Sequence, residues 1–193
     1  MLEPLRLAGG AARVAKGSVP VTDTPHLPRD RTELLAAVAV SWRAYRHVLD
    51  ELSDEQWEGP TDAQGWTIKD HVAHVTAWEN VVVEVFRSGV PPFATLQIPE
   101  ADWIERGFAS ATDLIYAQTS GQSLRRAMRN RDATHVRLVA ILEGLTEDEL
   151  RQPFMDSRSR DGERPVLAAM MEYLVDHYDK HRREIAAMTG TQA

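Results

Sequence analysis

Four long stretches of the sequence repeat apolar residues at intervals of three and four, and this spacing most limits what the chain can fold into. Such a repeat places one apolar stripe along a helix, and the stripe must be buried against other helices. The stretches lie at 30–52, 67–89, 123–144 and 165–188. Because no stretch alternates like a strand and no internal repeat is present, the sequence predicts an all-α four-helix bundle.

The ends of these stretches carry typical helix signals. Asp30 is followed three residues later by Glu33, which is a capping-box pattern, and the hydroxyl of Thr67 can cap the second helix. Asp70 adds negative charge to the first turn of that helix. Pro165 suits the first position of the last helix. These signals place the helix starts independently of the apolar spacing.

The chain is best interpreted as one domain preceded by a tail. Its 193 residues are enough for a single hydrophobic core. Residues 1–29 mix Gly, Pro, Ser and Thr with scattered apolar residues and show no period, so we interpret them as an N-terminal tail. Residues 30–193 then form the bundle, in which 99–119 supply one or two extra short helices.

Composition excludes several classes of function. The formal net charge of -7 argues against a nucleic-acid partner, because phosphate binding needs clustered Lys and Arg. The chain has no cysteine, so it has no disulfide, thiolate ligand or cysteine nucleophile of its own. No apolar run approaches the roughly 20 residues that span a bilayer. We therefore expect a cytoplasmic protein without a membrane partner.

Two histidines stand on the apolar stripe of the last helix. His177 and His181 are four residues apart, so their Cβ atoms are roughly 5–6 Å apart and both imidazoles can bind one metal ion. Alone, such a pair fits equally well at a solvated helix edge. The second helix carries His71 and His74, and either can supply a third ligand. Three histidines would leave an open coordination position, but periodicity cannot choose between His71 and His74.

These motifs resemble those of a known family. The sequence "GWTIKDHVAHVTAWE" at 65–79 is followed about a hundred residues later by "HYDKHRREI" at 177–185, and "RTELLAAV" opens the first helix. Together they resemble the DinB-like (YfiT-like) superfamily of four-helix-bundle metalloenzymes. Within it, the chain looks most like the ClbS/DfsB group. The resemblance covers roughly Arg31 to Met188 and leaves the tail outside.

The resemblance implies a particular metal site. The histidine of the "AH" step corresponds to His74, which is thereby preferred to His71, and the last-helix pair corresponds to His177 and His181. The implied ion is zinc or nickel. Imidazole binds these ions better than it binds calcium or magnesium, which prefer oxygen ligands. Glu79, next to the tryptophan of the motif, is predicted to be the catalytic polar residue of the pocket. Its alternative interpretation is a solvated charge on a helix face.

Other residues are candidates for the surroundings of the site. Asp176 and Asp179, like Glu79, are near enough in sequence to accept the second N–H of a metal-bound histidine. Among the aromatic residues, Trp78 is the first candidate for lining the pocket, although a core position is the alternative. We expect His135 at the boundary of the third helix.

Three functional hypotheses follow. In the first, a metal-dependent hydrolase or a transferase using a low-molecular-weight thiol acts on a small electrophile, in detoxification or self-resistance. In the second, a metal-independent protein of the ClbS type hydrolyses or sequesters a genotoxic natural product. The third is a non-catalytic bundle that acts in assembly. Core-facing histidines on separate helices are costly without partners, which favours the first two. The resemblance also implies a homodimer.

Overall fold

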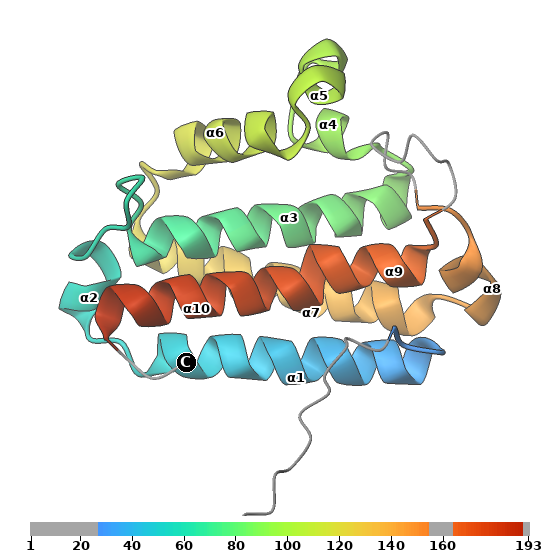
Figure 1. The fold of residues 1–193 in the computed structure, drawn as a ribbon, viewed down its shortest axis with the longest axis horizontal. Helices are drawn as coiled ribbons and strands as arrows, with labels where there is room; N and C mark the ends of the chain where they lie inside the picture. Colours follow the sequence, from blue (N-terminus) through green and yellow to red (C-terminus); the bar gives the residue numbers. More distant parts are fainter. Residues whose placement is uncertain (1–26, 155–163, 191–193) are drawn as a thin grey trace, which may run out of the picture.

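The fold is a bundle of four long helices with short helices between them (Figure 1). The structure, a computed structural model, describes residues 27–154 and 164–190. Within these ranges no strand occurs, and the predicted all-α bundle is confirmed. The long helices are α1 (Arg31–Asp50), α3 (Ile68–Ser88), α7 (Leu124–Gly144) and a composite C-terminal helix made of α9 (Val166–Met170), η1 (Met171–Asp176) and α10 (His177–Thr189). The short ones are α2 (Asp54–Glu58), α4 (Pro92–Thr95), α5 (Glu100–Arg106), α6 (Phe108–Thr119) and α8 (Glu147–Arg151).

Helix α3 is the most enclosed of the long helices. It packs against α7, α6 and α10, while α1 packs against α10 and α7. The segment from α4 to α6 crosses the outer side of α3 and returns the chain, so that α7 starts at the same end of the bundle as α3 (Figure 1). Because neighbours cover α3 on several sides, its polar residues become buried along with its apolar ones. Any chemistry carried by α3 therefore lies in the interior.

The start of α3 agrees with the sequence prediction. The Thr67 hydroxyl accepts a hydrogen bond from the backbone N–H of Asp70, and the Asp70 carboxylate accepts one from the Thr67 backbone in return. This reciprocal pair fixes where the helix begins and therefore which way its later residues face. The run of Val81, Val82 and Val83 stays helical because all three side chains are buried, which offsets their weak helix propensity.

The C-terminal helix departs from the expected regular α-helix. Pro165 is the N-cap of this helix, whereas the sequence predicted it at the first helical position. Pro165 pairs with Pro153 in an isolated antiparallel bridge and therefore keeps an extended backbone. Residues Met171–Asp176 form a π-helical segment that ends directly before His177. A π-segment adds a residue to the turn and is frequent at functional sites. It shifts the face that the following turns present to α3.

The domain boundaries proposed from the sequence remain predictions. Of the tail at 1–29, only 27–29 belong to the described residues, and the rest lies outside them. The extra helices expected at 99–119 are present as α5 and α6. Within the described ranges, no helix combines the length and the apolarity needed to cross a membrane.

Candidate metal site

Three histidines from α3 and α10 meet in the interior. His74 and His181 are buried and His177 is half-buried. The Nε2 atoms of His177 and His181 are 3.0 Å apart. The ring of His74 lies with its centroid 5.1 Å from the centroid of each of the other two. One nitrogen from each ring lies within 4.8 Å of the others, so the structure brings together the three residues predicted as ligands.

The second nitrogen of each α10 histidine has an acceptor beside it, which favours the tautomer with the ring proton on Nδ1. Nδ1 of His181 is 2.9 Å from the Glu184 carboxylate, which holds a proton on that nitrogen. His177 makes a hydrogen bond to the Tyr173 backbone that favours the protonated ring. We assign this bond to Nδ1, because Nε2 faces His181. With both protons on Nδ1, two Nε2 lone pairs face each other across 3.0 Å. A cation bound by both nitrogens would remove the repulsion between these lone pairs.

Burial keeps these rings neutral. Burial lowers the pKa of His74 and of His177 well below the ordinary value for histidine, and the neighbouring histidines and Lys180 lower both further. Nδ1 of His74 is buried and has no hydrogen-bond partner within the described residues. A buried polar atom without a partner is costly, and neutral imidazole is the form that binds metal ions. The cluster therefore has the protonation state of a metal site.

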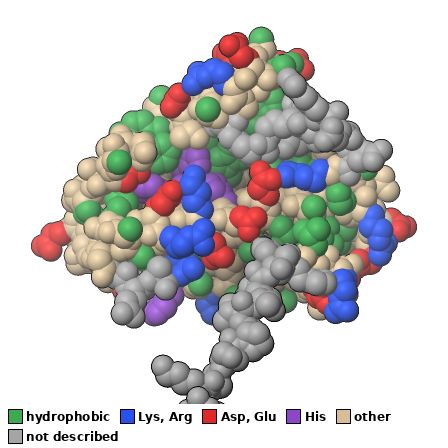
Figure 2. Space-filling view, in the orientation of Figure 1, with side chains coloured by type: hydrophobic (Ala, Val, Ile, Leu, Met, Phe, Trp, Pro, Cys, Tyr) green, Lys and Arg blue, Asp and Glu red, His purple; other side chains and the backbone are tan. Residues whose placement is uncertain are grey.

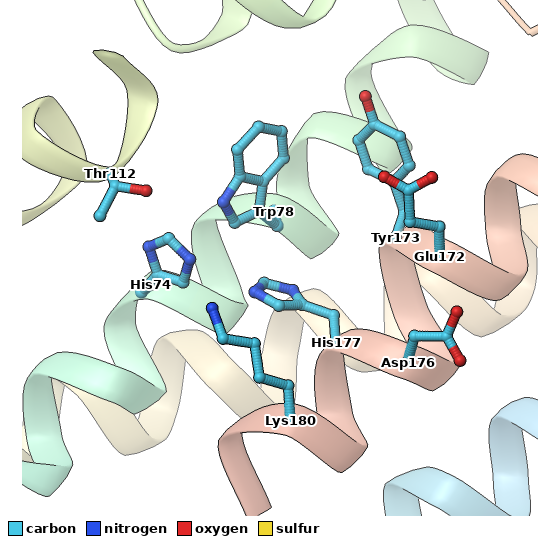
Figure 3. A pocket seen from close by; sticks show the side chains of 8 residues that line it. All are labelled: His74, Trp78, Thr112, Glu172, Tyr173, Asp176, His177 and Lys180. Atoms are coloured by element: carbon cyan, nitrogen blue, oxygen red, sulfur yellow. The ribbon is translucent and has the colours of Figure 1, made fainter. Parts of the chain in front are cut away.

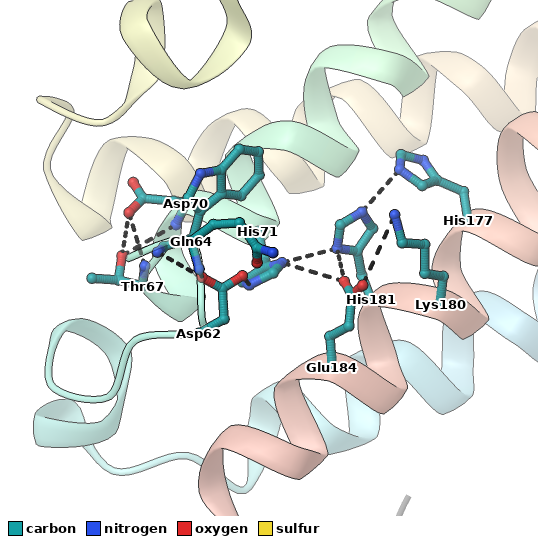
Figure 4. A network of polar contacts seen from close by, with 10 residues as sticks. Asp62, Gln64, Thr67, Asp70, His71, His177, Lys180, His181 and Glu184 are labelled. Atoms are coloured by element: carbon teal, nitrogen blue, oxygen red, sulfur yellow. Dashed lines mark hydrogen bonds and ion pairs between the residues drawn. The ribbon is translucent and has the colours of Figure 1, made fainter. Parts of the chain in front are cut away.

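His71 lies beside this cluster. Its Nδ1 atom is 3.0 Å from Nδ1 of His181 and 3.6 Å from the Glu184 carboxylate (Figure 4). Its Nε2 atom is 3.2 Å from the Asp62 carboxylate, an ion-pair distance at an angle too poor for a good hydrogen bond. Together His71, His181 and Glu184 form a second group whose donor atoms lie within 4.8 Å of one another. Both α3 histidines thus approach His181, but on different sides of its ring.

A cavity of about 280 Å³ opens beside the three histidines. Figure 3 shows its lining, in which the His74, His177 and Lys180 side chains converge from α3 and α10. The lining consists of His74, Trp78, Thr112, Glu172, Tyr173, Asp176, His177 and Lys180. In the space-filling view the histidines (purple) are visible at the bottom of a hollow rimmed by acidic and basic side chains (Figure 2). A small molecule can therefore reach His74 and His177 from solvent.

The structure does not place Glu79 in this cavity, contrary to the expectation from the sequence. Its side chain is fully buried on another side of α3, where it accepts hydrogen bonds from the Tyr178 hydroxyl at 2.5 Å and from His135 at 2.9 Å. The ring of His135 stacks on Trp42 with 3.7 Å between centroids. Burial raises the pKa of Glu79, and its two hydrogen bonds oppose that shift. We call Glu79, Tyr178, His135 and Trp42 the Glu79 cluster.

The remaining candidates divide between the cavity and the core. Trp78 lines the cavity, as the sequence indicated. Asp176 lines it as well, but the acceptors beside the second nitrogens of His181 and His177 are Glu184 and the Tyr173 backbone, not Asp176 as the sequence suggested. Asp179 instead accepts a hydrogen bond from Ser41 on α1. Sequence reasoning missed Glu184 and Asp62. Glu184 lies three residues after His181, one helical turn away, and that spacing is a signal which could have identified it.

Comparison with known proteins places the chain in a family. Residues 37–185 match the family model of the DinB superfamily. The chain belongs to the DinB superfamily. No curated protein matches it in sequence.

Three solved structures show the same fold at low identity. The colibactin self-resistance protein ClbS in complex with a dsDNA has a TM-score of 0.66 and 12% identity, over 87% of this chain and 100% of that one. The sibling lethal factor precursor DfsB has a TM-score of 0.66 and 15% identity, over 84% and 96%. YfiT from Bacillus subtilis, described as "a probable metal-dependent hydrolase with an unusual four-helix bundle topology", has a TM-score of 0.52 and 14% identity, over 93% and 95%.

Proposed function

We propose that the chain is a metal-dependent hydrolase or thiol-dependent transferase that acts on a small electrophilic compound. The observation that carries the proposal is the 3.0 Å contact between Nε2 of His177 and Nε2 of His181, whose other nitrogens already have hydrogen-bond acceptors. A proton or a metal ion between the two atoms would relieve the repulsion. Burial disfavours the extra proton, so a metal ion is the better occupant.

The residues present fit a zinc or nickel ion. His74, His177 and His181 would hold it, because three neutral imidazoles are a common ligand set for a catalytic zinc. Nδ1 of His74 is buried without a hydrogen-bond partner within the described residues, which further supports a ligand at this site. The ion would supply Lewis acidity, which makes a water molecule or a thiol a stronger nucleophile near neutral pH.

The cavity residues have separate tasks in this proposal. Trp78 and Tyr173 provide the apolar wall that holds the body of the substrate. The Asp176 carboxyl group has a pKa raised by partial burial and by the charges of Asp179 and Glu172, so it can accept the proton that the nucleophile loses. Lys180 at the rim can balance negative charge that develops on the leaving group.

A second candidate is a metal-independent resistance protein that hydrolyses or sequesters a genotoxic natural product. The ClbS structure favours it, because that self-resistance protein shares the fold over most of this chain. The ClbS structure also contains dsDNA, so our expectation that nucleic acid is not a partner finds no support in the comparisons. Duplex DNA therefore belongs among the ligands to be tested. The homodimer also remains a prediction.

A turnover assay distinguishes the two candidates. The protein is stripped of metal with a chelator, reloaded with zinc or nickel, and offered a panel of epoxides, activated halides and enones, with water alone or with a low-molecular-weight thiol. We expect turnover only after reloading, and its loss in His177→Asn and Asp176→Asn. The control is His47→Asn, because His47 is an exposed histidine on α1. Turnover that survives chelation and His177→Asn would favour the metal-independent candidate.

A further inference from the structure

Three donor atoms converge on the side of His181 that faces away from His177. They are Nδ1 of His71, Nδ1 of His181 and a carboxylate oxygen of Glu184 (Figure 4). The two nitrogens are 3.0 Å apart, and the Glu184 oxygen is 2.9 Å from His181 and 3.6 Å from His71. His71 and His181 are buried, whereas Glu184 reaches solvent with 37% of its side chain exposed. The group comes from α3 and α10 but does not line the cavity described above.

The three donor atoms of this group share fewer protons than they could hold. The Asp62 carboxylate lies 3.2 Å from Nε2 of His71 at an angle too poor for a good hydrogen bond, but its negative charge still favours the His71 proton on that nitrogen. With the proton there, Nδ1 of His71 has a lone pair. Nδ1 of His181 has one proton at most when the ring is neutral. A single proton then lies among three atoms that can each accept one. A hydrogen bond from His181 to Glu184 accounts for two of them, but Nδ1 of His71 remains without a proton of its own.

Spacing and charge both match a cation site. Around a tetrahedral zinc ion with bonds of about 2.0–2.1 Å, neighbouring donors are about 3.3–3.4 Å apart. The three separations here lie on either side of that value. Two carboxylates, from Glu184 and Asp62, contribute negative charge within contact distance of the histidines, whereas the three-histidine group has no carboxylate among its ligands.

We propose that His71, His181 and Glu184 form a second divalent-cation site, which shares His181 with the three-histidine site. Nε2 of His181 serves the first site and Nδ1 serves the second, so the ring connects the two ions. Zinc and similar transition ions suit two imidazoles and one carboxylate. The second ion takes the place of the His181 Nδ1 proton, which is released to solvent. This inference rests on the proposed function only in assigning Nε2 of His181 to the first site.

Zinc stoichiometry tests the inference. The tag-free full-length protein is stripped of metal, dialysed to equilibrium against increasing free zinc, and analysed for bound zinc per chain. We expect saturation at two ions per chain. His71→Asn should reduce saturation to one ion per chain, and so should Glu184→Gln, a nearly isosteric substitution. His74→Asn should also reduce it to one by removing the other ion, and His181→Asn should abolish both. His47→Asn is the matched control and should keep two.

The variants separate failure of this inference from failure of the proposed function. Saturation at one ion that is lost in His74→Asn and kept in His71→Asn and Glu184→Gln would overturn the second site and leave the proposed function intact. One ion that is lost in His71→Asn and Glu184→Gln but kept in His74→Asn would establish the second site and contradict the proposed three-histidine site. A second ion that persists in both His71→Asn and Glu184→Gln would overturn the inference. Circular dichroism of each variant confirms that it is folded.

Discussion

The cluster of His74, His177 and His181 and the Glu79 cluster both join α3 to α10, but the Glu79 cluster also includes residues of α7 and α1, and the two clusters differ in how their polar atoms pair. In the Glu79 cluster, one carboxylate oxygen meets two donors, the Tyr178 hydroxyl and His135. In the histidine cluster, the Nε2 atoms of His177 and His181 face each other as acceptors. Oε1 of Glu79 is thus paired by protein groups, whereas its Oε2 is buried without a hydrogen-bond partner within the described residues. The difference between the clusters is that Glu79 Oε1 meets donors, whereas two acceptors face each other in the histidine cluster, and that contact calls for a cation.

The largest expected effect concerns stability and lies in the Glu79 cluster. His135→Ala removes one of the two hydrogen bonds to the buried Glu79 carboxylate and the stacking on Trp42. The lost hydrogen bond costs about 1.5–3 kcal/mol of unfolding free energy, and the lost stacking costs about 0.5–1.5 kcal/mol more. Urea denaturation measures it. A cost below about 1 kcal/mol would mean that the cluster contributes little to the fold, and a double-mutant cycle with Glu79→Gln isolates the pair.

A smaller loss of stability is expected for Tyr178→Phe. The substitution deletes the hydroxyl that donates to Glu79 and leaves the ring in place, so it removes one hydrogen bond to a charged group, worth about 1.5–3 kcal/mol. Metal content should be unchanged, although Tyr178 adjoins His177. Loss of bound metal in this variant, with the fold intact, would show that the two clusters are coupled instead of separate.

The pH dependence of stability should reveal the histidine cluster in the metal-free protein. His74 and His177 have pKa values below the unfolded value near 6.5, so the unfolded chain binds more protons as pH falls below that value. The contribution of these two rings to the free energy of unfolding is complete above about pH 6.5. Below that pH the free energy of unfolding falls by up to about 1.4 kcal/mol per pH unit for each ring. Denaturation between pH 7.5 and 5 measures the slope. An equal slope in His74→Asn would contradict the assignment.

The smallest expected effect belongs to Lys180 at the cavity rim. Its positive charge lowers the pKa of His74, His177 and His181, and it should repel a bound cation in the same way. Because 61% of the side chain is exposed, solvent screens the repulsion to less than about 1 kcal/mol. Lys180→Gln should therefore tighten zinc binding by a few-fold in competition with a chelator. Weaker binding would indicate that Lys180 supports the site.

The proximity of His74, His177 and His181 could be predicted from the sequence, although their role as metal ligands stays a prediction. Helix geometry indicated the pair on the last helix, and the family resemblance indicated His74. His177 and His181 share one stripe four residues apart, and the Thr67–Asp70 capping box fixes the start of the helix that carries His74. The same geometry argues against Glu79 as a pocket residue, because five residues after His74 correspond to a rotation of roughly 140° around the helix. Its position next to Trp78 in the motif was a misleading guide.

Other features depend on tertiary structure and could not be predicted. Asp62 reaches His71 because the loop before α3 folds back, with its carboxylate accepting the backbone N–H groups of Gln64 and Trp66. Periodicity could not choose between His71 and His74, because neighbours bury α3 on several sides and both rings face α10. The π-helical segment before His177 has no recognised sequence signal.

Metal content of the tag-free protein, measured by elemental analysis alongside His74→Asn, His177→Asn and Tyr178→Phe, tests the central claim most directly. At least one zinc or nickel ion per chain is expected in the wild type. Both histidine variants should lose an ion and Tyr178→Phe should keep it, since Tyr178 is not among the residues proposed to hold the ion. A wild-type protein that is folded yet binds neither zinc nor nickel after incubation would contradict the account, as would an ion that both histidine variants retain.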